Sequence, residues 1–233
     1  MTGPDTKTTI LDAAEALFAE HGYDGTSLRS VTARAKVNLA AVNYHFGGKE
    51  RLATEVLLRR VGPINAERHR RLDALPSRPT MAAIVRAFVE PVFPVRAGCP
   101  AGPAAPGRDF CRMFGRMMAE QPPFLRTFLA GQFRELGHRF VACVRSTRTA
   151  IDPATAWWRL HFMAGAMAHT LLAGDGIAHL TEGLCDPDDA ETTVAQLVAF
   201  VAAGLAGPTT SRRPRIRGRT TRPARTTQRR SRR

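Results

Sequence analysis

The sequence predicts an all-α protein. Apolar residues recur at helical spacing along most of the chain, and pairs of proline and glycine divide this pattern into segments of helical length. No stretch of useful length alternates apolar and polar residues as a half-buried strand does. With 233 residues, 44% of them hydrophobic, the chain has enough apolar material for an ordinary folded core.

Three short helices are expected within the first 47 residues. The first covers residues 5–21, and Gly22 stands just past its end, where helices favour glycine. Thr26 or Ser27 can cap a second helix, and Asn38 can cap a third, which ends near Phe46-Gly47-Gly48. Helices this short need a shared core. Their inward residues are Ile10, Leu11, Ala14, Leu17 and Phe18, then Leu28, Val31 and Ala35, then Val42 and Phe46.

Helical periodicity continues to about residue 207. A longer fourth helix carries Leu52, Val56 and Leu57 on its apolar stripe, and the pattern persists past Pro63. Residues 94–108, with several prolines and glycines, are expected to form a loop.

Two further helices are predicted to be separated by Pro122-Pro123, and the second of them is long. Asp152-Pro153 and Asp186-Pro187 each set a capping side chain before a proline at the first helical position. The last two helices are therefore expected to start at these dipeptides.

Composition excludes several classes of protein. The cysteines Cys99, Cys111, Cys143 and Cys185 form no CxxC pair, so we expect small buried side chains and no metal or redox site. No apolar run is long enough to span a bilayer, and the first ten residues lack the apolar segment of a secretory signal. These features predict a cytoplasmic protein with no membrane partner.

Basic charge is concentrated in the final segment. Residues 208–233 contain eleven arginines and no acid, so this tail is expected to be disordered. It is either a solvated tail that aids solubility or a segment that contacts DNA without sequence preference. The net charge of +14 favours the second interpretation.

The run from Thr26 to Lys49, TSLRSVTARAKVNLAAVNYHFGGK, resembles the DNA-binding signature of the TetR family of transcription regulators. The resemblance extends back over LDAAEALFAEHGYDGTS. It implies a helix-turn-helix domain at residues 5–62 and a helical effector-binding and dimerisation domain at 63–207, ahead of the tail at 208–233. In such a motif the second helix enters the major groove of double-stranded DNA. Lys36, where the family usually has glycine, and Gly48, where it has a serine or asparagine cap, depart from the pattern.

The resemblance also implies which residues touch operator DNA. Thr26, Tyr44 and Lys49 would hold phosphates, with Ser27 beside them, and the residues at or near base edges would be Asn38, Leu39, Ala40, Ala41, Asn43 and His45. The chemistry agrees, because an asparagine offers a donor and an acceptor to adenine and alanine methyl groups suit thymine.

Two later segments, CRMFGRMMAE and WWRLHFMAGAMAH, are similar to the PsrA-like branch of fatty-acid-responsive TetR regulators. The resemblance implies a homodimer and a pocket for an apolar effector such as a fatty acid or acyl-CoA. The expected lining residues are Phe110, Met113, Phe114, Met117, Phe128, Phe133, Trp157, His161 and Met167. A packed core would explain the same residues. Candidates to hold a charged head group are Arg112, Arg116, Arg126, Arg134 and His161.

The predicted function is that of a regulator, most often a repressor, released from a palindromic operator by its effector. One alternative is a small helical enzyme that uses His161 in acid–base chemistry. No nucleophile, base and carboxylate fall together in any spacing, and no phosphate-binding glycine loop is present, so neither catalysis nor a cofactor is expected. Another alternative is an architectural DNA-binding protein that acts through its tail and needs no effector.

Overall fold

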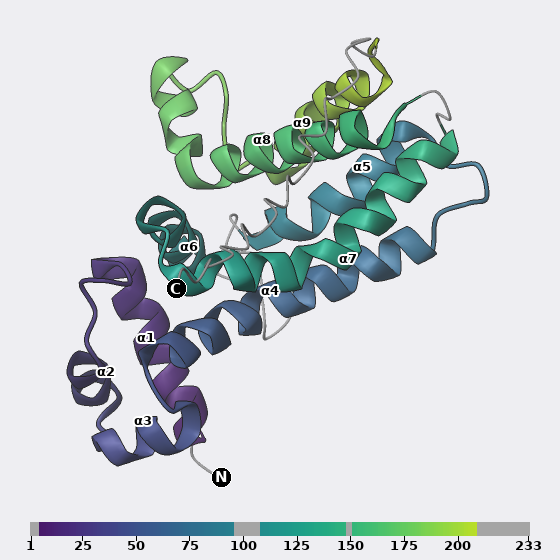
Figure 1. Cartoon of the computed structure of the whole chain (residues 1–233). Coiled ribbons are helices and arrows are strands. Elements are labelled where there is room, and N and C mark those ends of the chain that lie inside the picture. Colours follow the sequence, from purple (N-terminus) through teal and green to yellow (C-terminus); the bar gives the residue numbers. More distant parts are fainter. Residues whose placement is uncertain (1–4, 96–107, 148–150, 209–233) are drawn as a thin grey trace, which may run out of the picture.

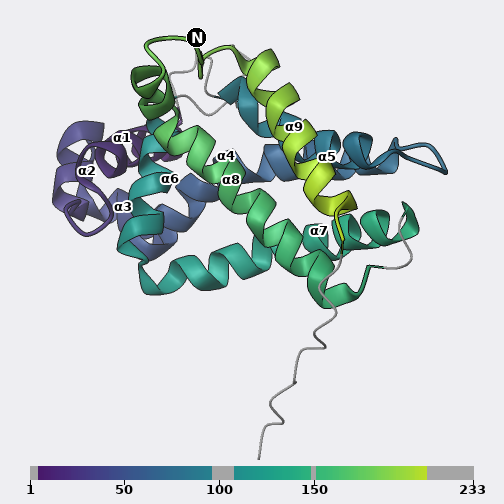
Figure 2. The ribbon, with the colours of Figure 1, turned by 90° about the horizontal axis from the view of Figure 1, so that it is seen from above.

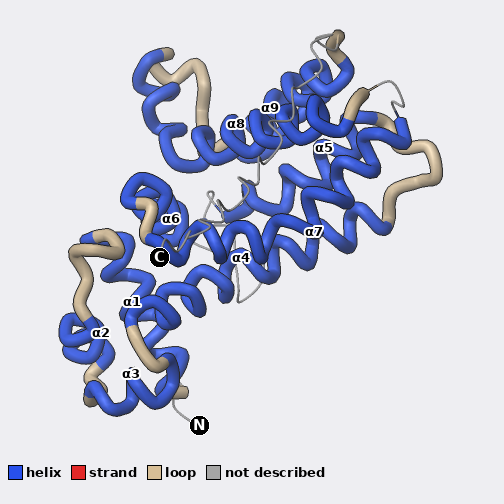
Figure 3. Tube along the Cα trace, viewed as in Figure 1, coloured by secondary structure: helices blue, strands red, loops and turns tan. Residues whose placement is uncertain are grey.

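The computed structural model describes residues 5–95, 108–147 and 151–208. These residues form helices joined by short loops, with no strand among them (Figure 3). The predicted all-α class is confirmed. Within the same ranges, no helix is long and apolar enough to cross a membrane. The arginine-rich tail beyond Pro208 and most of the expected loop, at residues 96–107, lie outside the described residues.

Three short helices gather at one end of the molecule (Figure 1). They are α1 (Thr6–His21), α2 (Leu28–Ala35) and α3 (Leu39–Phe46). Their inward residues are those expected from the periodicity: Phe18, Val31 and Val42 are almost completely buried. Because they share one core with the start of α4, these helices are stable despite their lengths.

Helix α4 (Lys49–Asp73) connects this end to the rest of the molecule. It runs without interruption through Pro63, so the predicted domain boundary at residues 62 and 63 falls inside a helix. Glu15 of α1 fixes its first half, with Oε2 2.5 Å from Arg59 Nη2 and Oε1 3.0 Å from Arg60 Nη2. Burial opposes the charge of Arg59, but the hydrogen bonds that it donates to Glu15 and Asp12 outweigh this effect and raise the arginine pKa.

The remaining helices form a bundle over α4. They are α5 (Met81–Val89), the 3-10 helix η1 (Glu90–Val95), α6 (Arg108–Glu120), α7 (Pro123–Thr147), α8 (Pro153–Leu180) and α9 (Ala190–Ala206). Helix α7 lies along α4, and α8 and α9 pack beside each other on the far side of the bundle (Figures 1 and 2). Helix α6 lies against α1, which brings the bundle into contact with the three short helices.

Two hydrophobic cores meet in the interior. The first joins α1 to α4 with α6 and the start of α7, and the second joins α5, α8, α9 and the rest of α7. Phe133, Met167 and Leu171 pack against both cores. These three side chains therefore connect the two cores.

The start of α8 is as predicted and the start of α9 is not. Asp152 caps α8 through the backbone N–H of Thr155, with Pro153 at the first helical position. Helix α9 begins three residues later than expected, at Ala190, because Asp189 caps it. The side chain of Asp186 instead accepts a hydrogen bond from the backbone N–H of Asp188 and closes a turn.

The cysteines are less buried than expected. Cys111 and Cys143 are half-buried, and Cys185 is exposed in the turn after α8. The prediction of a small buried side chain is therefore wrong for Cys185. Cys99 lies outside the described residues.

Lys36 lies in the turn between α2 and α3 with φ 54° and ψ 41°, in the left-handed region. Its backbone N–H reaches the carbonyl oxygens of Ala33 and Thr32, which ends α2. A residue with a Cβ is strained in this conformation, and Lys36 adopts it where the family usually has glycine.

We expect Lys36→Gly to raise the free energy of unfolding by about 1 kcal/mol, because glycine adopts this conformation without a Cβ clash. Urea unfolding followed by circular dichroism measures the change. Lys36→Ala is the matched control, since it removes the same charge and keeps the Cβ. Equal stabilities of the glycine and alanine variants would show that strain at this position is negligible.

Candidate nucleic-acid interface

Helix α3 is held at both ends by local hydrogen bonds. Asn38 Oδ1 accepts from the backbone N–H of Ala41 at 2.8 Å, and Gly47, in the left-handed region, donates its N–H to the carbonyl of Asn43. The preceding helix is fixed in a similar way, by a capping box between Ser27 and Ser30. A short helix with both ends capped presents its outer face at a defined angle.

The two faces of α3 differ sharply. Val42 and Phe46 are buried, whereas Tyr44 is 85% exposed. The other exposed residues at this surface are Asn38, Leu39, Ala40 and Asn43, and the half-buried ones are Ala41, His45 and Lys49. Ser27, before α2, is exposed as well. Nine of the ten residues expected to touch DNA, all except Thr26, therefore have accessible surface.

Thr26 is the exception. Its side chain is only 2% exposed, and its hydroxyl lies 2.7 Å from the carbonyl oxygen of Gly22 and 3.1 Å from that of Leu17. The expected phosphate contact by this side chain is corrected: the hydroxyl ties the start of α2 to the end of α1.

Lys49 is anchored as well as accessible. Its Nζ lies 4.3 Å from the centroid of the Tyr23 ring, which itself packs between the rings of Phe18 and Phe124. Burial, followed by the charges of Glu50 and Asp24, raises the pKa of Tyr23. The phenol therefore stays neutral at physiological pH.

Glu120, at the end of α6, is a contact that the sequence did not reveal. Its Oε2 accepts a hydrogen bond from the backbone N–H of Tyr23 at 2.7 Å. Gly22 permits this approach, because it has φ 77° and a Cβ there would lie 1.8 Å from Glu120 Oε1. The two partners are 97 residues apart in sequence, so no local pattern could have paired them.

The nine residues expected to line an effector pocket lie in three different environments. Seven belong to or pack against the first core: Phe110, Met113, Phe114, Met117, Phe128, Phe133 and Met167. Trp157 packs against the second core, with its ring edge over Gly137. The expectation for His161 is wrong, because its side chain is exposed and stacks edge-on against the exposed ring of Trp158.

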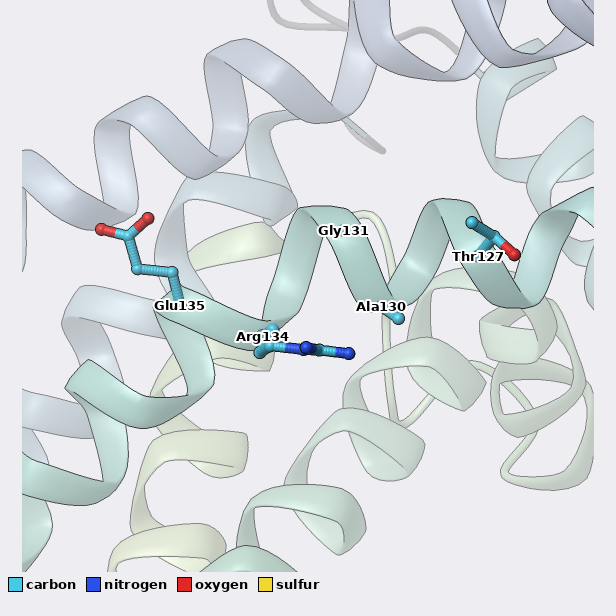
Figure 4. A pocket seen from close by; sticks show the side chains of 5 residues that line it. All are labelled: Thr127, Ala130, Gly131, Arg134 and Glu135. Atoms are coloured by element: carbon cyan, nitrogen blue, oxygen red, sulfur yellow. The ribbon is translucent and has the colours of Figure 1, made fainter.

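A hollow of about 430 Å³ lies beside α7 (Figure 4). Its lining residues are Thr127, Ala130, Gly131, Arg134 and Glu135. None of them is among the nine expected pocket residues. Arg134 alone was expected near an effector, as a candidate to hold a charged head group.

These features together define a helix-turn-helix DNA-binding protein: two short helices joined by a tight turn, with the outer face of the second exposed. Residues 10–56 match the family model of bacterial regulatory proteins of the tetR family, and residues 86–204 match that of the tetracyclin repressor-like C-terminal domain. The chain belongs to the TetR family of transcriptional regulators.

Curated relatives match over a short part of the chain, and the match spans less than a third of their own length. The HTH-type transcriptional repressor Rv3405c of Mycobacterium tuberculosis is 47% identical over 53 residues, which cover 23% of this chain and 28% of that protein.

Solved structures match over most of the chain. The fatty acid degradation regulator FadR of Bacillus halodurans has a TM-score of 0.64 at 14% identity, covering 89% of this chain and all of that one. FadR of Bacillus subtilis, solved with stearoyl-CoA, has a TM-score of 0.64 at 12% identity, covering 84% and 98%. At these identities the likeness establishes the fold.

We expect Thr26→Val to lower the free energy of unfolding by about 1 to 2 kcal/mol, because it removes a buried hydroxyl and leaves carbonyl oxygens without that donor. Thermal unfolding followed by circular dichroism measures the loss. Thr26→Ser keeps the hydroxyl and should lose less. A valine variant as stable as the wild type but weaker on DNA would return Thr26 to the set of phosphate contacts.

Proposed function

We propose that this protein is a homodimeric repressor that binds a palindromic operator and is released by an apolar effector. The observation that carries the proposal is the exposed outer face of α3, held rigidly by caps at both ends. In this proposal Tyr44, Lys49 and Ser27 contact phosphates. Base edges are read by Asn38, Leu39, Ala40, Ala41, Asn43 and His45.

An exposed apolar face supports the homodimer. Trp158 and Phe162 of α8 stack on each other and are 61% and 63% exposed, and Phe200 of α9 is 72% exposed. Large aromatic side chains on two neighbouring helices are typical of a surface that a partner covers. A two-fold axis at this face would give the dimer two α3 helices, one for each half of a palindromic site.

The apolar effector is supported by the first core and by one structural relative. Phenylalanine and methionine side chains from α6 and α7 fill that core, and methionine adapts easily to a bound chain. FadR of Bacillus subtilis, which shares this fold, was solved with stearoyl-CoA. A fatty acid or acyl-CoA is therefore the proposed effector class.

Release would follow from the contact between α6 and α1. An effector that inserts between α6 and α7 favours a position of α6 in which the hydrogen bond between Glu120 and Tyr23 is altered. The weakening of DNA binding then equals, by linkage, the weakening of effector binding on DNA.

We expect Asn43→Ala to weaken discrimination at one base pair by about 1 to 3 kcal/mol, because it removes a donor and an acceptor from the groove. Tyr44→Ala should weaken binding to all sequences about equally, since a phosphate contact carries no base information. Selection from random duplexes followed by anisotropy titration measures both effects.

Ser77→Ala, an exposed hydroxyl in the loop between α4 and α5, is the control for these variants and should bind as the wild type does. If Asn43→Ala and Tyr44→Ala also bind as the wild type does, α3 does not read the operator.

We expect compounds with an apolar chain to release the operator with a potency that rises with chain length and then levels off. Each buried methylene contributes about 0.8 kcal/mol until the site is full. Gel shifts with chains of roughly 8 to 18 carbons, a range suited to typical pocket sizes, measure this dependence. A potency that is independent of chain length would contradict an apolar effector.

A further inference from the structure

Arg68 of α4 lies deep in the interior, with only 2% of its surface exposed. Four helices meet around it. Its guanidinium carbon is 4.1 Å from the ring centroid of Phe88 on α5 and 6.0 Å from that of Phe133 on α7, and Met167 of α8 reaches its end. Arg68 therefore lies where the two hydrophobic cores meet.

The guanidinium has more donors than its neighbours accept. Nε donates to the carbonyl oxygen of Phe88 at 2.8 Å, and Nη1 donates to Asn65 Oδ1 at 3.0 Å. Nη2 has the thioether sulfur of Met167, a weak acceptor, at 3.5 Å. An arginine carries five N–H groups, so only two of them meet an oxygen.

No carboxylate among the described residues pairs with Arg68. On the same helix, Glu67 pairs with Arg70 and Arg71, and Asp73 pairs with Arg139. Burial alone lowers the pKa of Arg68 to about 9, so the side chain remains charged at neutral pH.

A purely structural role explains only part of this arrangement. The bond from Nε satisfies Phe88 in the last turn of α5, where carbonyl groups lack helical partners. The aromatic face of Phe88 and the two oxygen acceptors offset part of the charge, but no described carboxylate neutralises it, and a buried charge without a counter-ion is unfavourable. Because the side chains of Phe88, Phe133 and Met167 around Arg68 are apolar, the anion that fits here belongs to a molecule with an apolar body.

We propose that Arg68 is the anion-binding end of the effector site, where Nη1 and Nη2 hold the carboxylate of an apolar acid in place of the Met167 thioether. This inference rests on the proposed apolar effector and specifies its head group. It also replaces the arginines expected from the sequence, of which Arg134 is exposed on α7.

A free carboxylate fits this position better than a coenzyme A ester. A carboxylate presents two oxygens to the guanidinium fork, whereas a thioester is uncharged at the carbonyl. The phosphates of coenzyme A carry a bulky polar nucleotide, which does not fit among the side chains of Phe88, Phe133 and Met167.

The test compares an acid with the alcohol of the same chain length on the full chain. Dissociation constants for dodecanoate, 1-dodecanol and dodecanoyl-CoA are measured by tryptophan fluorescence, and operator release is measured in parallel. We expect the wild type to prefer the acid and Arg68→Met to reduce that preference about 10- to 100-fold, the range typical of hydrogen bonds to charged groups. Arg134→Met is the matched control and should keep the wild-type preference.

The outcomes separate this inference from the proposed function. Equal binding of acid and alcohol by the wild type, or an unchanged preference in Arg68→Met, overturns the carboxylate site and leaves an apolar effector standing. Tighter binding of dodecanoyl-CoA that is lost in Arg68→Met overturns the free acid. Binding of none of the three overturns the effector class and this site together.

Folding of the variants is checked by their melting temperatures. Arg68→Met replaces a buried charge by an apolar chain of similar length, which is often neutral or stabilising. Arg68→Lys keeps the charge and loses the planar fork, so its preference for the acid should fall by a smaller factor. If Arg68→Met does not fold, an unchanged preference in Arg68→Lys overturns the carboxylate site.

Discussion

The contact between Glu15 and two arginines of α4 is the interaction on which the rest of the structure depends. This carboxylate is almost completely buried, and it pairs with both Arg59 and Arg60. Removal of one partner from a buried ion pair leaves an uncompensated charge, so the pairing is strict. It fixes α1, and through their shared core α2 and α3, to a helix that continues into the bundle. The orientation of α3 is thus tied to the position of α4.

The three short helices are not an independent unit. Their core includes side chains of α6 and α7, and Glu120 accepts a hydrogen bond from the turn that precedes α2. Phe133, Met167 and Leu171 connect this core to the second one. A change in packing where the two cores meet is therefore transmitted to both of them, because close-packed interiors rearrange between discrete states and do not deform gradually.

Features set by local sequence were predictable, and features set by distant contacts were not. The first three helices and the cap at Asp152 follow from neighbouring residues, and the structure has all of them. Asp186 misled because three aspartates lie within four residues, and the third, Asp189, caps α9. Thr26 and Arg68 are polar residues, and the hydrophobic pattern around them does not mark either of them as buried. Their burial depends on neighbours from elsewhere in the chain, which periodicity does not identify.

Because α4 is one continuous helix, a small tilt about one of its ends produces a large displacement of the other. Its 25 residues span about 37 Å at the usual rise per residue. A tilt of about 5° about one end would displace the other by about 3 Å, close to the roughly 3.4 Å step between neighbouring bases of a strand. A rotation of only a few degrees at the bundle end of α4 is therefore, at its other end, a shift of about one base pair.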